Sequence, residues 1–430
     1  MANSSSPSLL LSFVNDVDDP RSPLGKLHSL ETIITIALVA MICGADEWVE
    51  IEEFGNAKLD LFQGHFGVAG SGIPSHDTFG RVFGLLDTLA FQESFRAYTQ
   101  QLSGRAKTIS IDGKTMRGSH DTYHDKSSKH IVSAWANESR LVLAQVATTE
   151  KSNEITAIPE LLGLLELDGC VVTIDAMGTQ KAIAHKIIDS GADYVLAVKG
   201  NQAELAEEIT ENFEKVGVRP NVQVYKTVDG GHGRVEIRTY QVCTVTDYLT
   251  PQLVSQWPEL KTMIMVDSQV EFTNGRRQGE SRTERRFFIS SLAPGQALIA
   301  GRAIRSHWGI ENSLHYVLDV AFREDHNRTR IGNSAVNQSV LRHYALNQLR
   351  QEKSAKVGVK AKRKKAGWDN QYLLKVLLAS QGVVARTHKF EHVIWGLTRW
   401  AGARIFGLLR QKIKQPAHVI KDKEGRAVRG

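Results

Sequence analysis

Three acidic residues, each in a different local setting, are the strongest candidates for chemistry in this chain of 430 residues. Asp112 follows the apolar alternating run KTISI and precedes a glycine that predicts a turn. Asp175 ends the apolar run CVVTI, and Glu311 lies inside the helical pattern RAIRSHWGIENSLHYVLD. Two carboxylates at strand ends and one on a later helix can converge on one point.

Converging carboxylates of this kind hold divalent cations. Their hard oxygen atoms suit Mg²⁺ or Mn²⁺, and two such ions about 3.5–4 Å apart form the apparatus for in-line attack on a phosphodiester. The pattern therefore predicts an enzyme that cuts and rejoins nucleic acid. Each acid also has an ordinary structural explanation, because aspartates at strand ends are often helix caps or turn formers, and helix surfaces carry many acids.

The helix expected around Glu311 carries two histidines close to that acid. His307, Glu311 and His315 are spaced four residues apart and share one helix face. A zinc hydrolase site made of these three residues is a weaker alternative, because the chain has no HExxH motif and both aspartates would be left without a role.

The same helix presents cations and aromatic rings. Arg302 and Arg305 could hold phosphate oxygens in bidentate pairs, and a solvated basic surface is the alternative. Trp308 and Tyr316 lie on a neighbouring stripe of the helix. Packing in a core is the more common use of such residues, so we expect the two aromatic side chains to be buried.

The formal net charge of +6 favours a polyanionic partner. A basic run without any acid extends over residues 353–365, and we interpret residues 353–367 as a linker. A solvated linker without a partner is the alternative. The cations of this run that we expect to contact a DNA backbone are Lys362, Arg363, Lys364 and Lys365.

Cysteine usage and hydropathy argue against several other classes of protein. The three cysteines are far apart and form no CxxC pair, so neither a zinc knuckle nor a disulfide framework is indicated. A reducing cytoplasm is the simplest setting. The longest apolar stretch, residues 32–45, is too short to span a bilayer, so no membrane partner is expected.

The order of the predicted elements indicates an α/β fold. Strands within residues 105–200 first form a meander and then alternate with helices, which predicts a ribonuclease-H-like mixed-sheet core. A β-rich insertion interrupts the core, and a small all-α domain precedes it, either as a helix-turn-helix-like module or as a packing domain. The expected ranges are 1–25 for a flexible lead, 26–100 for the helical N-terminal domain, 105–202 and 293–350 for the core, 203–292 for the insertion, 353–367 for the basic linker and 368–430 for a helical C-terminal extension.

Four segments carry a specific resemblance. IDGKTMRGS, TIDAMGTQKAIAHKI, ADYVLAVKGNQ and IRSHWGIENSLHYVLDVAFRED resemble the signature segments of bacterial insertion-sequence DDE transposases, in the branch that includes the H-repeat-associated proteins. The resemblance covers roughly residues 10–380. It implies that Asp112, Asp175 and Glu311 are the catalytic and metal-binding triad, and that residues 199–202 match the family's KGNQ segment.

Two features depart from this family pattern. Related transposases carry an arginine four residues before the final acid and a lysine seven residues after it, where this chain has His307 and Leu318. Phosphate contacts must then fall to other residues, such as Arg302, Arg305 or His307. The pKa of His307 is expected to rise beside a metal-bound carboxylate and DNA phosphates. Residues after about 380 match no part of the family pattern.

The resemblance implies a DNA transposase that uses two Mg²⁺ ions, for which Mn²⁺ can substitute. Asp112 would bridge both ions, while Asp175 and Glu311 would each complete one. The implied partners are double-stranded DNA, as terminal inverted repeats and as target, and a second copy of the chain. The implied location is the cytoplasm, at the nucleoid. The alternatives are a nuclease that cuts without joining and a catalytically inactive, transposase-derived DNA-binding protein.

Overall fold

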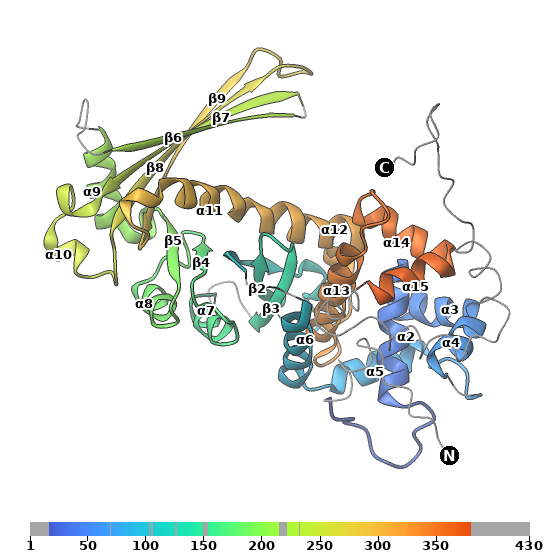
Figure 1. The fold of residues 1–430 in the computed structure, drawn as a ribbon. Coiled ribbons are helices and arrows are strands. Elements are labelled where there is room, and N and C mark those ends of the chain that lie inside the picture. The colour runs from blue at the N-terminus through green and yellow to red at the C-terminus, as the bar shows by residue number, and fades with distance from the viewer. Residues whose placement is uncertain are drawn as a thin grey trace, which may run out of the picture. The chain divides into compact units, whose positions relative to one another are not determined.

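The computed structural model describes residues 17–379, apart from 69, 103, 105, 125–126, 149–153, 215–221 and 232 (Figure 1). These residues belong to one compact unit. Most of the expected flexible lead and of the expected C-terminal extension lies outside the described residues.

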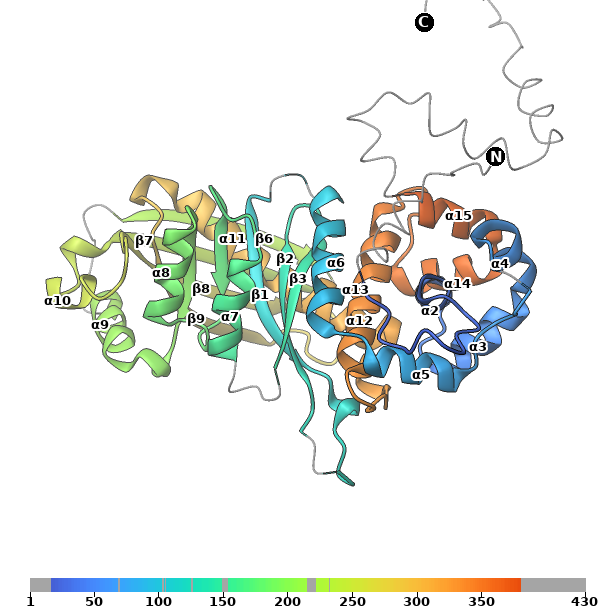
Figure 2. The same ribbon diagram turned by 90° about the horizontal axis from the view of Figure 1, so that it is seen from below.

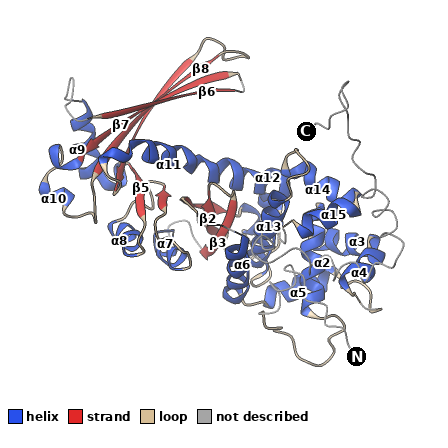
Figure 3. Cartoon of the chain, viewed as in Figure 1, coloured by secondary structure: helices blue, strands red, loops and turns tan. Residues whose placement is uncertain are grey.

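A mixed sheet is the centre of the described fold (Figures 1 and 3). Its strand order is β3-β2-β1-β4-β5-β9-β8-β7-β6. The first three strands form the expected antiparallel meander, and β4 and β5 run parallel to β1. The strands are β1 (Thr108–Thr115), β2 (His130–Ala136), β3 (Leu141–Thr148), β4 (Val171–Ile174), β5 (Asp193–Val198), β6 (Gln223–Gly231), β7 (Arg234–Thr244), β8 (Thr262–Phe272) and β9 (Ser281–Ser290).

Helices cover both faces of this sheet (Figure 2). On one face, α7 (Glu154–Gly163) and α8 (Lys181–Asp189) bury their apolar sides against alternate residues of β1 and β4. On the other face lies α11 (Ala297–Gly309), whose alanines and Ile304 pack on the opposite set of strand residues. The outcome is a three-layered core.

The period of two along a strand decides which helix each β1 residue meets. Ile109 and Ile111 belong to the core shared with α7 and α8. Ser110 and Asp112 therefore point to the opposite face, which α11 covers. The apolar alternation of β1 thus directs Asp112 toward the helix that leads to Glu311.

The predicted β-rich insertion continues the core sheet instead of forming a separate one. β9 pairs antiparallel with β5, with Val195 opposite Ser290, and β8, β7 and β6 follow outward. Two helices complete this region, α9 (Ala203–Glu214) and α10 (Pro251–Val254). The strands of the insertion are therefore anchored to the strand that follows Asp175.

The helices that precede and follow the sheet share one apolar core. Residues of α2 are buried on every side of that helix and pack with α13 and α14. The helices are α2 (Leu30–Cys43), α3 (Trp48–Ala57), α4 (Leu59–Phe66), α5 (His76–Leu85), α6 (Thr88–Leu102), α13 (Ser334–Gln351), α14 (Val359–Trp368) and α15 (Asn370–Leu378).

Two helix boundaries in the N-terminal region follow sequence signals. α2 ends at Gly44, whose φ of 109° is a backbone conformation that glycine adopts with little strain. α5 begins after Ser75, whose Oγ accepts a hydrogen bond from the backbone N–H of Thr78.

The basic segment differs from the expected linker, because most of it is helix α14.

No single helix among the described residues has the length and apolarity needed to cross a membrane. The helices α2 and α3 reach that length and apolarity only when they are counted together across the 93° bend between them. A buried core helix such as α2 has the same apolar composition.

Candidate active site

Asp112 lies within β1 rather than at its end. The strand continues through Gly113 to Thr115, so the expected glycine turn is wrong. A Cβ on Gly113 would lie 2.2 Å from Nε2 of His130 and 2.4 Å from Oε1 of Glu154. Glycine is therefore required here because the buried pair of His130 and Glu154 occupies the space that a side chain would need.

Asp175 directly follows β4, as predicted, and starts the turn that leads into α8. Its Oδ1 accepts a hydrogen bond from the backbone N–H of Gly178 at 3.2 Å. Thr179 fixes the same turn by donating to the backbone oxygens of Asp175 and Ala197. The turn-forming role and the candidate catalytic role thus coexist, because Oδ2 takes no part in the Gly178 hydrogen bond.

Glu311 lies on a π-helical segment, Ile310–His315, which joins α11 to α12 (Tyr316–Phe322) in one continuous helix (Figure 1). Such wide turns often occur at functional sites. Nδ1 of His315 lies 3.5 Å from Oδ2 of Asp112 and 3.8 Å from Oε2 of Glu311. The π segment therefore places a buried histidine between a strand carboxylate and a helix carboxylate.

The structure brings together Asp112, Glu311 and His315, whose potential ligand atoms all lie within 4.8 Å of one another. Asp175 is outside that group, although its negative charge contributes to raising the pKa of Asp112. His315 was predicted as a ligand only in the zinc alternative, with His307 and Glu311, and its grouping with Asp112 was not predicted. Its spacing of four residues from Glu311 was the available signal, but only the contact with Asp112 distinguishes His315 from His307.

The electrostatics of this group favour a divalent cation. Burial, followed by the charges of Glu311 and Asp175, raises the pKa of Asp112 to about 8. The hydrogen bond with His315 is the main reason why the pKa of Glu311 is lowered to about 2. Asp112 therefore keeps a proton at neutral pH, which reduces the repulsion between its carboxylate and those of Glu311 and Asp175. A bound cation would reduce the same repulsion. The two carboxylates suit Mg²⁺ and Mn²⁺, whereas the imidazole of His315 is a ligand more typical of softer transition metals.

The raised pKa predicts that Mn²⁺ binding depends on pH. A metal ion must displace the proton of Asp112, so the affinity should fall about tenfold for each unit of pH below about 8. Calorimetric titration with Mn²⁺ at several values between about pH 6 and pH 8 measures this slope. In Asp112→Asn both the affinity and the slope should be lost. An affinity that stays constant over this range would contradict the shared proton.

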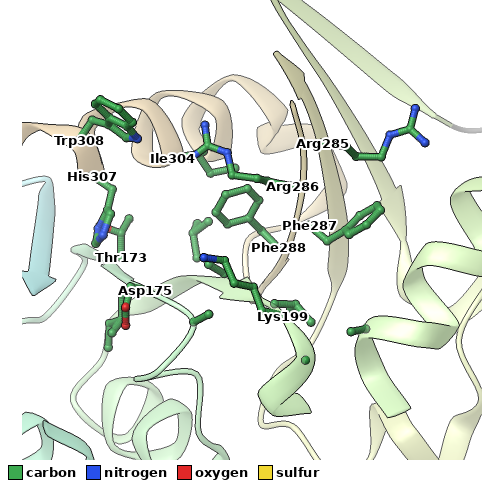
Figure 4. A pocket seen from close by; sticks show the side chains of 17 residues that line it. Thr173, Asp175, Lys199, Arg285, Arg286, Phe287, Phe288, Ile304, His307 and Trp308 are labelled. Carbon is green, nitrogen blue, oxygen red and sulfur yellow. The ribbon is translucent and has the colours of Figure 1, made fainter. Parts of the chain in front are cut away.

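A cavity of about 400 Å³ opens beside Asp175, between β4, β5, β9 and α11 (Figure 4). Its walls are mostly apolar, and Phe288 lies among them. The polar groups at its surface include Lys199, from the predicted KGNQ segment, and Arg286 of β9. Trp308 lines the cavity from α11 (Figure 4). The region next to Asp175 can therefore hold a group that has both an apolar face and a negative charge.

His307 reaches the same cavity but not as the expected cation. Its Nδ1 lies 3.0 Å from Oγ1 of Thr173, in the strand before Asp175. Burial lowers the pKa of His307 to about 4, and this outweighs the opposing effect of Asp175 and Glu311. The pKa of His307 is therefore lowered in the protein alone, and its expected rise beside a metal-bound carboxylate and DNA phosphates stays a prediction. His307 is neutral at pH 7 and does not replace the charge of an arginine.

The two aromatic residues and the two arginines singled out on this helix are exposed. Trp308 is 48% exposed and Tyr316 is 62% exposed, so the expected core packing of the two rings is wrong. Arg302 and Arg305 are exposed as well, and Nε of Arg305 lies 3.5 Å from Oδ2 of Asp229 in β6. Both arginines thus stay accessible to a ligand along α11.

Two of the four cations predicted to contact DNA in the basic run are buried. Nζ of Lys362 donates to the backbone oxygen of Leu349, and Arg363 pairs with Asp46 at 2.5 Å. Lys362 and Arg363 therefore hold α14 against the helical core and cannot reach a phosphate in this fold. Lys364 and Lys365 are exposed, and their contact with DNA stays a prediction.

Lys114, which was not predicted as a site residue, connects the strand that carries Asp112 to the segment that follows Glu311. It follows Asp112 by two positions in β1 and is only 10% exposed. Its Nζ lies 2.8 Å from Asp319, 3.2 Å from Glu324 and 2.9 Å from Asp325. Because these acids follow Glu311 along the chain, Lys114 fixes the strand that carries Asp112 to the helix that carries Glu311.

Lys114→Met is therefore expected to impair metal use more than DNA binding. Loss of an outer residue that orients metal ligands typically costs roughly 10–100-fold in metal affinity or activity. A Mn²⁺ titration of DNA cleavage would detect the shift, and Lys114→Arg should restore part of it. Lys107→Met, which changes an exposed lysine directly before the same strand, is the matched control. Equal Mn²⁺ requirements for Lys114→Met and Lys107→Met would contradict this role.

Comparison with known proteins gives consistent matches. Residues 103–348 match the family described as "Transposase DDE domain", and residues 11–99 match the "DDE_Tnp_1-associated" family. The "Putative transposase YncI" of Escherichia coli O157:H7 is 41% identical over 89% of this chain and 98% of its own length. The "H repeat-associated putative transposase YhhI" of Escherichia coli K12 is 40% identical over 80% of this chain and 90% of its own. A piggyBac transposase synaptic complex with hairpin DNA aligns at a TM-score of 0.38 and 10% identity, over 94% of this chain and 82% of that one.

Proposed function

This chain belongs to the DDE transposase family, and on that premise we propose that it is a DNA transposase that cleaves phosphodiesters at element ends and joins them to target DNA. The catalytic carboxylates in this proposal are Asp112, Asp175 and Glu311. The observation that carries the proposal is the convergence of Asp112 with Glu311 across 199 residues of sequence, with His315 between them.

The proposed core is ribonuclease-H-like. The supporting observation is the strand order β3-β2-β1-β4-β5, with an antiparallel meander followed by two strands parallel to β1. In this arrangement Asp112 on β1 and Asp175 after β4 lie on neighbouring strands, and the long insertion before Glu311 joins the same sheet through the pairing of β9 with β5. Ile111 pairs with Ile174 in these parallel strands, so Asp112 and Asp175, the next residue of each chain segment, are at the same level of the sheet.

The proposed cofactor is a pair of Mg²⁺ ions, with Mn²⁺ as a substitute. Asp112 would contact both ions, Asp175 would complete one, and Glu311 with His315 would complete the other. When bound, such ions make the attacking oxygen more acidic and neutralise charge on the leaving oxygen. The oxygen-rich donor set and the raised pKa of Asp112 support this assignment.

The protein's own residues would position the DNA. Lys199 and Arg286 flank the cavity beside Asp175 and can hold phosphate oxygens there. Arg302 and Arg305 are exposed on α11 and can extend these contacts away from the carboxylates. His307 is proposed to orient Thr173, and through it the end of β4, because its ring is neutral and lies 3.0 Å from that hydroxyl.

The proposed partners are double-stranded DNA, as terminal inverted repeats and as target, and a second copy of the chain. A pair of identical subunits would give each of two identical element ends its own catalytic site. Such a protein would act at the nucleoid.

A cleavage and strand-transfer assay tests this function. The substrate is duplex DNA from the inverted repeats that bracket the reading frame, with supercoiled plasmid as target. Mg²⁺-dependent cleavage followed by covalent joining to the plasmid is the expected result. Cleavage without joining would indicate a nuclease, and binding without cleavage would indicate an inactive DNA-binding protein.

A further inference from the structure

Two short segments beyond the catalytic group are fastened together. One is the turn Arg117–Ser119 after β1, and the other is residues 323–330, which follow α12; we call them the double loop. A Cβ on Gly118 would lie 2.2 Å from the backbone oxygen of Asn327, so the two backbones touch. The backbone N–H of Arg117 donates to Asp325, and Nε of Arg330 donates to the backbone oxygen of Gly118.

The acidic and the basic side chains of the double loop differ in their exposure to solvent. Its two acids turn inward, since Glu324 is 2% exposed and both Glu324 and Asp325 contact Lys114. Its arginines are exposed, and only Arg117 has an ion-pair partner among the described residues, which is Asp325 at 3.6 Å. The outer surface of the double loop therefore presents arginines without exposed acids between them. These exposed arginines are Arg117, Arg323, Arg328 and Arg330.

Arg323 occupies a backbone position that does not favour a large side chain. Its φ of 52° lies in the left-handed region, where it caps α12 by donating its N–H to the backbone oxygen of Leu318. Glycine would adopt this conformation with less strain. The cap itself needs only the backbone N–H of residue 323, so we infer that the arginine side chain has a separate role.

The distance between the double loop and Glu311 along the helix can be expressed as a length of duplex DNA. α11, the π segment and α12 form one continuous helix, with Arg305 before Glu311 and Arg323 after it. At about 1.5 Å per residue, Arg305 and Arg323 are separated by roughly 27 Å along the axis. This equals about eight base pairs of duplex DNA, since each strand advances about 3.4 Å per nucleotide. Glu311 lies between these two basic positions.

We propose that the double loop binds the phosphate backbone of duplex DNA about five base pairs from the cleaved bond, on the side opposite the contacts made by α11 and the β6–β9 insertion. Five base pairs correspond to the roughly 18 Å between Glu311 and Arg323. Arginine forks fit phosphate oxygens. The inference rests on the proposed DNA cleavage function and adds to it a second contact surface, through which the DNA is held on both sides of the carboxylates.

The double variant Arg323→Gln with Arg328→Gln tests this surface. Neither side chain has a hydrogen bond or ion pair with the described residues, so the fold should be kept, and circular dichroism verifies it. The matched control, Lys107→Gln with Lys186→Gln, removes the same charge from the opposite edge of the sheet, at the start of β1 and the end of α8. The probes are a duplex of arbitrary sequence for salt titration and the cleavable end duplex for footprinting.

Loss of two phosphate contacts should reduce the slope of log K against log salt by about 2, while the control leaves the slope unchanged. Hydroxyl-radical footprints of the double variant should lose protection on one side only, about five base pairs from the cleavage point. Equal salt slopes and footprints for the double variant and the control would overturn the proposal. Absence of cleavage by the wild-type protein would refute the proposed function instead, so the two failures are distinguishable.

Discussion

Asp112→Asn, Asp175→Asn and Glu311→Gln are each expected to abolish Mg²⁺-dependent DNA cleavage while leaving DNA binding largely intact. Each change keeps the shape of the side chain and removes an anionic oxygen ligand. The loss should be at least about 10³-fold, because single groups that act as one catalytic unit are not additive. Single-turnover cleavage of the end duplex measures the rate, and a gel-shift titration with the same duplex measures binding.

Glu207→Gln is a suitable control for these three variants, because Glu207 is an exposed acid on α9 outside the site. It should cleave at the wild-type rate. A near-normal rate in any of the three site variants would remove that residue from the catalytic group. Asp319 and Glu324 are poor replacements for Glu311, because both contact Lys114.

Arg363→Met is expected to lower the free energy of unfolding by about 3–5 kcal/mol, because it leaves Asp46 buried without its partner. Burial already raises the pKa of Asp46 although Arg363 lies beside it. The guanidinium also donates to the backbone oxygen of Met41 and lies over the ring of Phe322. Urea denaturation followed by circular dichroism measures the change.

Two further variants serve as the control and as the rescue for Arg363→Met. Lys364→Met, which is exposed on the same helix, should change the free energy of unfolding by less than about 0.5 kcal/mol. Combining Arg363→Met with Asp46→Leu should recover part of the loss, since an apolar pair can replace a buried ion pair. Equal stabilities for the Arg363 and Lys364 variants would mean that Arg363 does not hold α14 to the core.

Local patterns explain which parts of the fold and site were predictable. The alternation of KTISI and the apolar run CVVTI predicted β1 and β4, and with them the approach of Asp112 to Asp175 in the sheet. The helical pattern around Glu311 predicted a helix, but nothing in the spacing distinguishes an α-helix from the π segment that aims His315 at Asp112.

The unpredicted features depend on contacts between distant residues. The run that contains Lys362 and Arg363 has the composition of a solvated linker, and the partner of Arg363 is 317 positions away. Lys114 resembles any other strand lysine until three acids from beyond Glu311 surround it. The direction of the pKa shift of His307 likewise follows from its burial, which the sequence pattern does not contain.

The central claim is that Asp112, Asp175 and Glu311 form one two-metal centre. Anomalous diffraction at the manganese edge, from crystals of the protein with end DNA and Mn²⁺, tests it most directly. Two peaks are expected, one between Asp112 and Asp175 and one between Asp112 and Glu311. A single peak held by Glu311 and His315, with none beside Asp175, would contradict the claim.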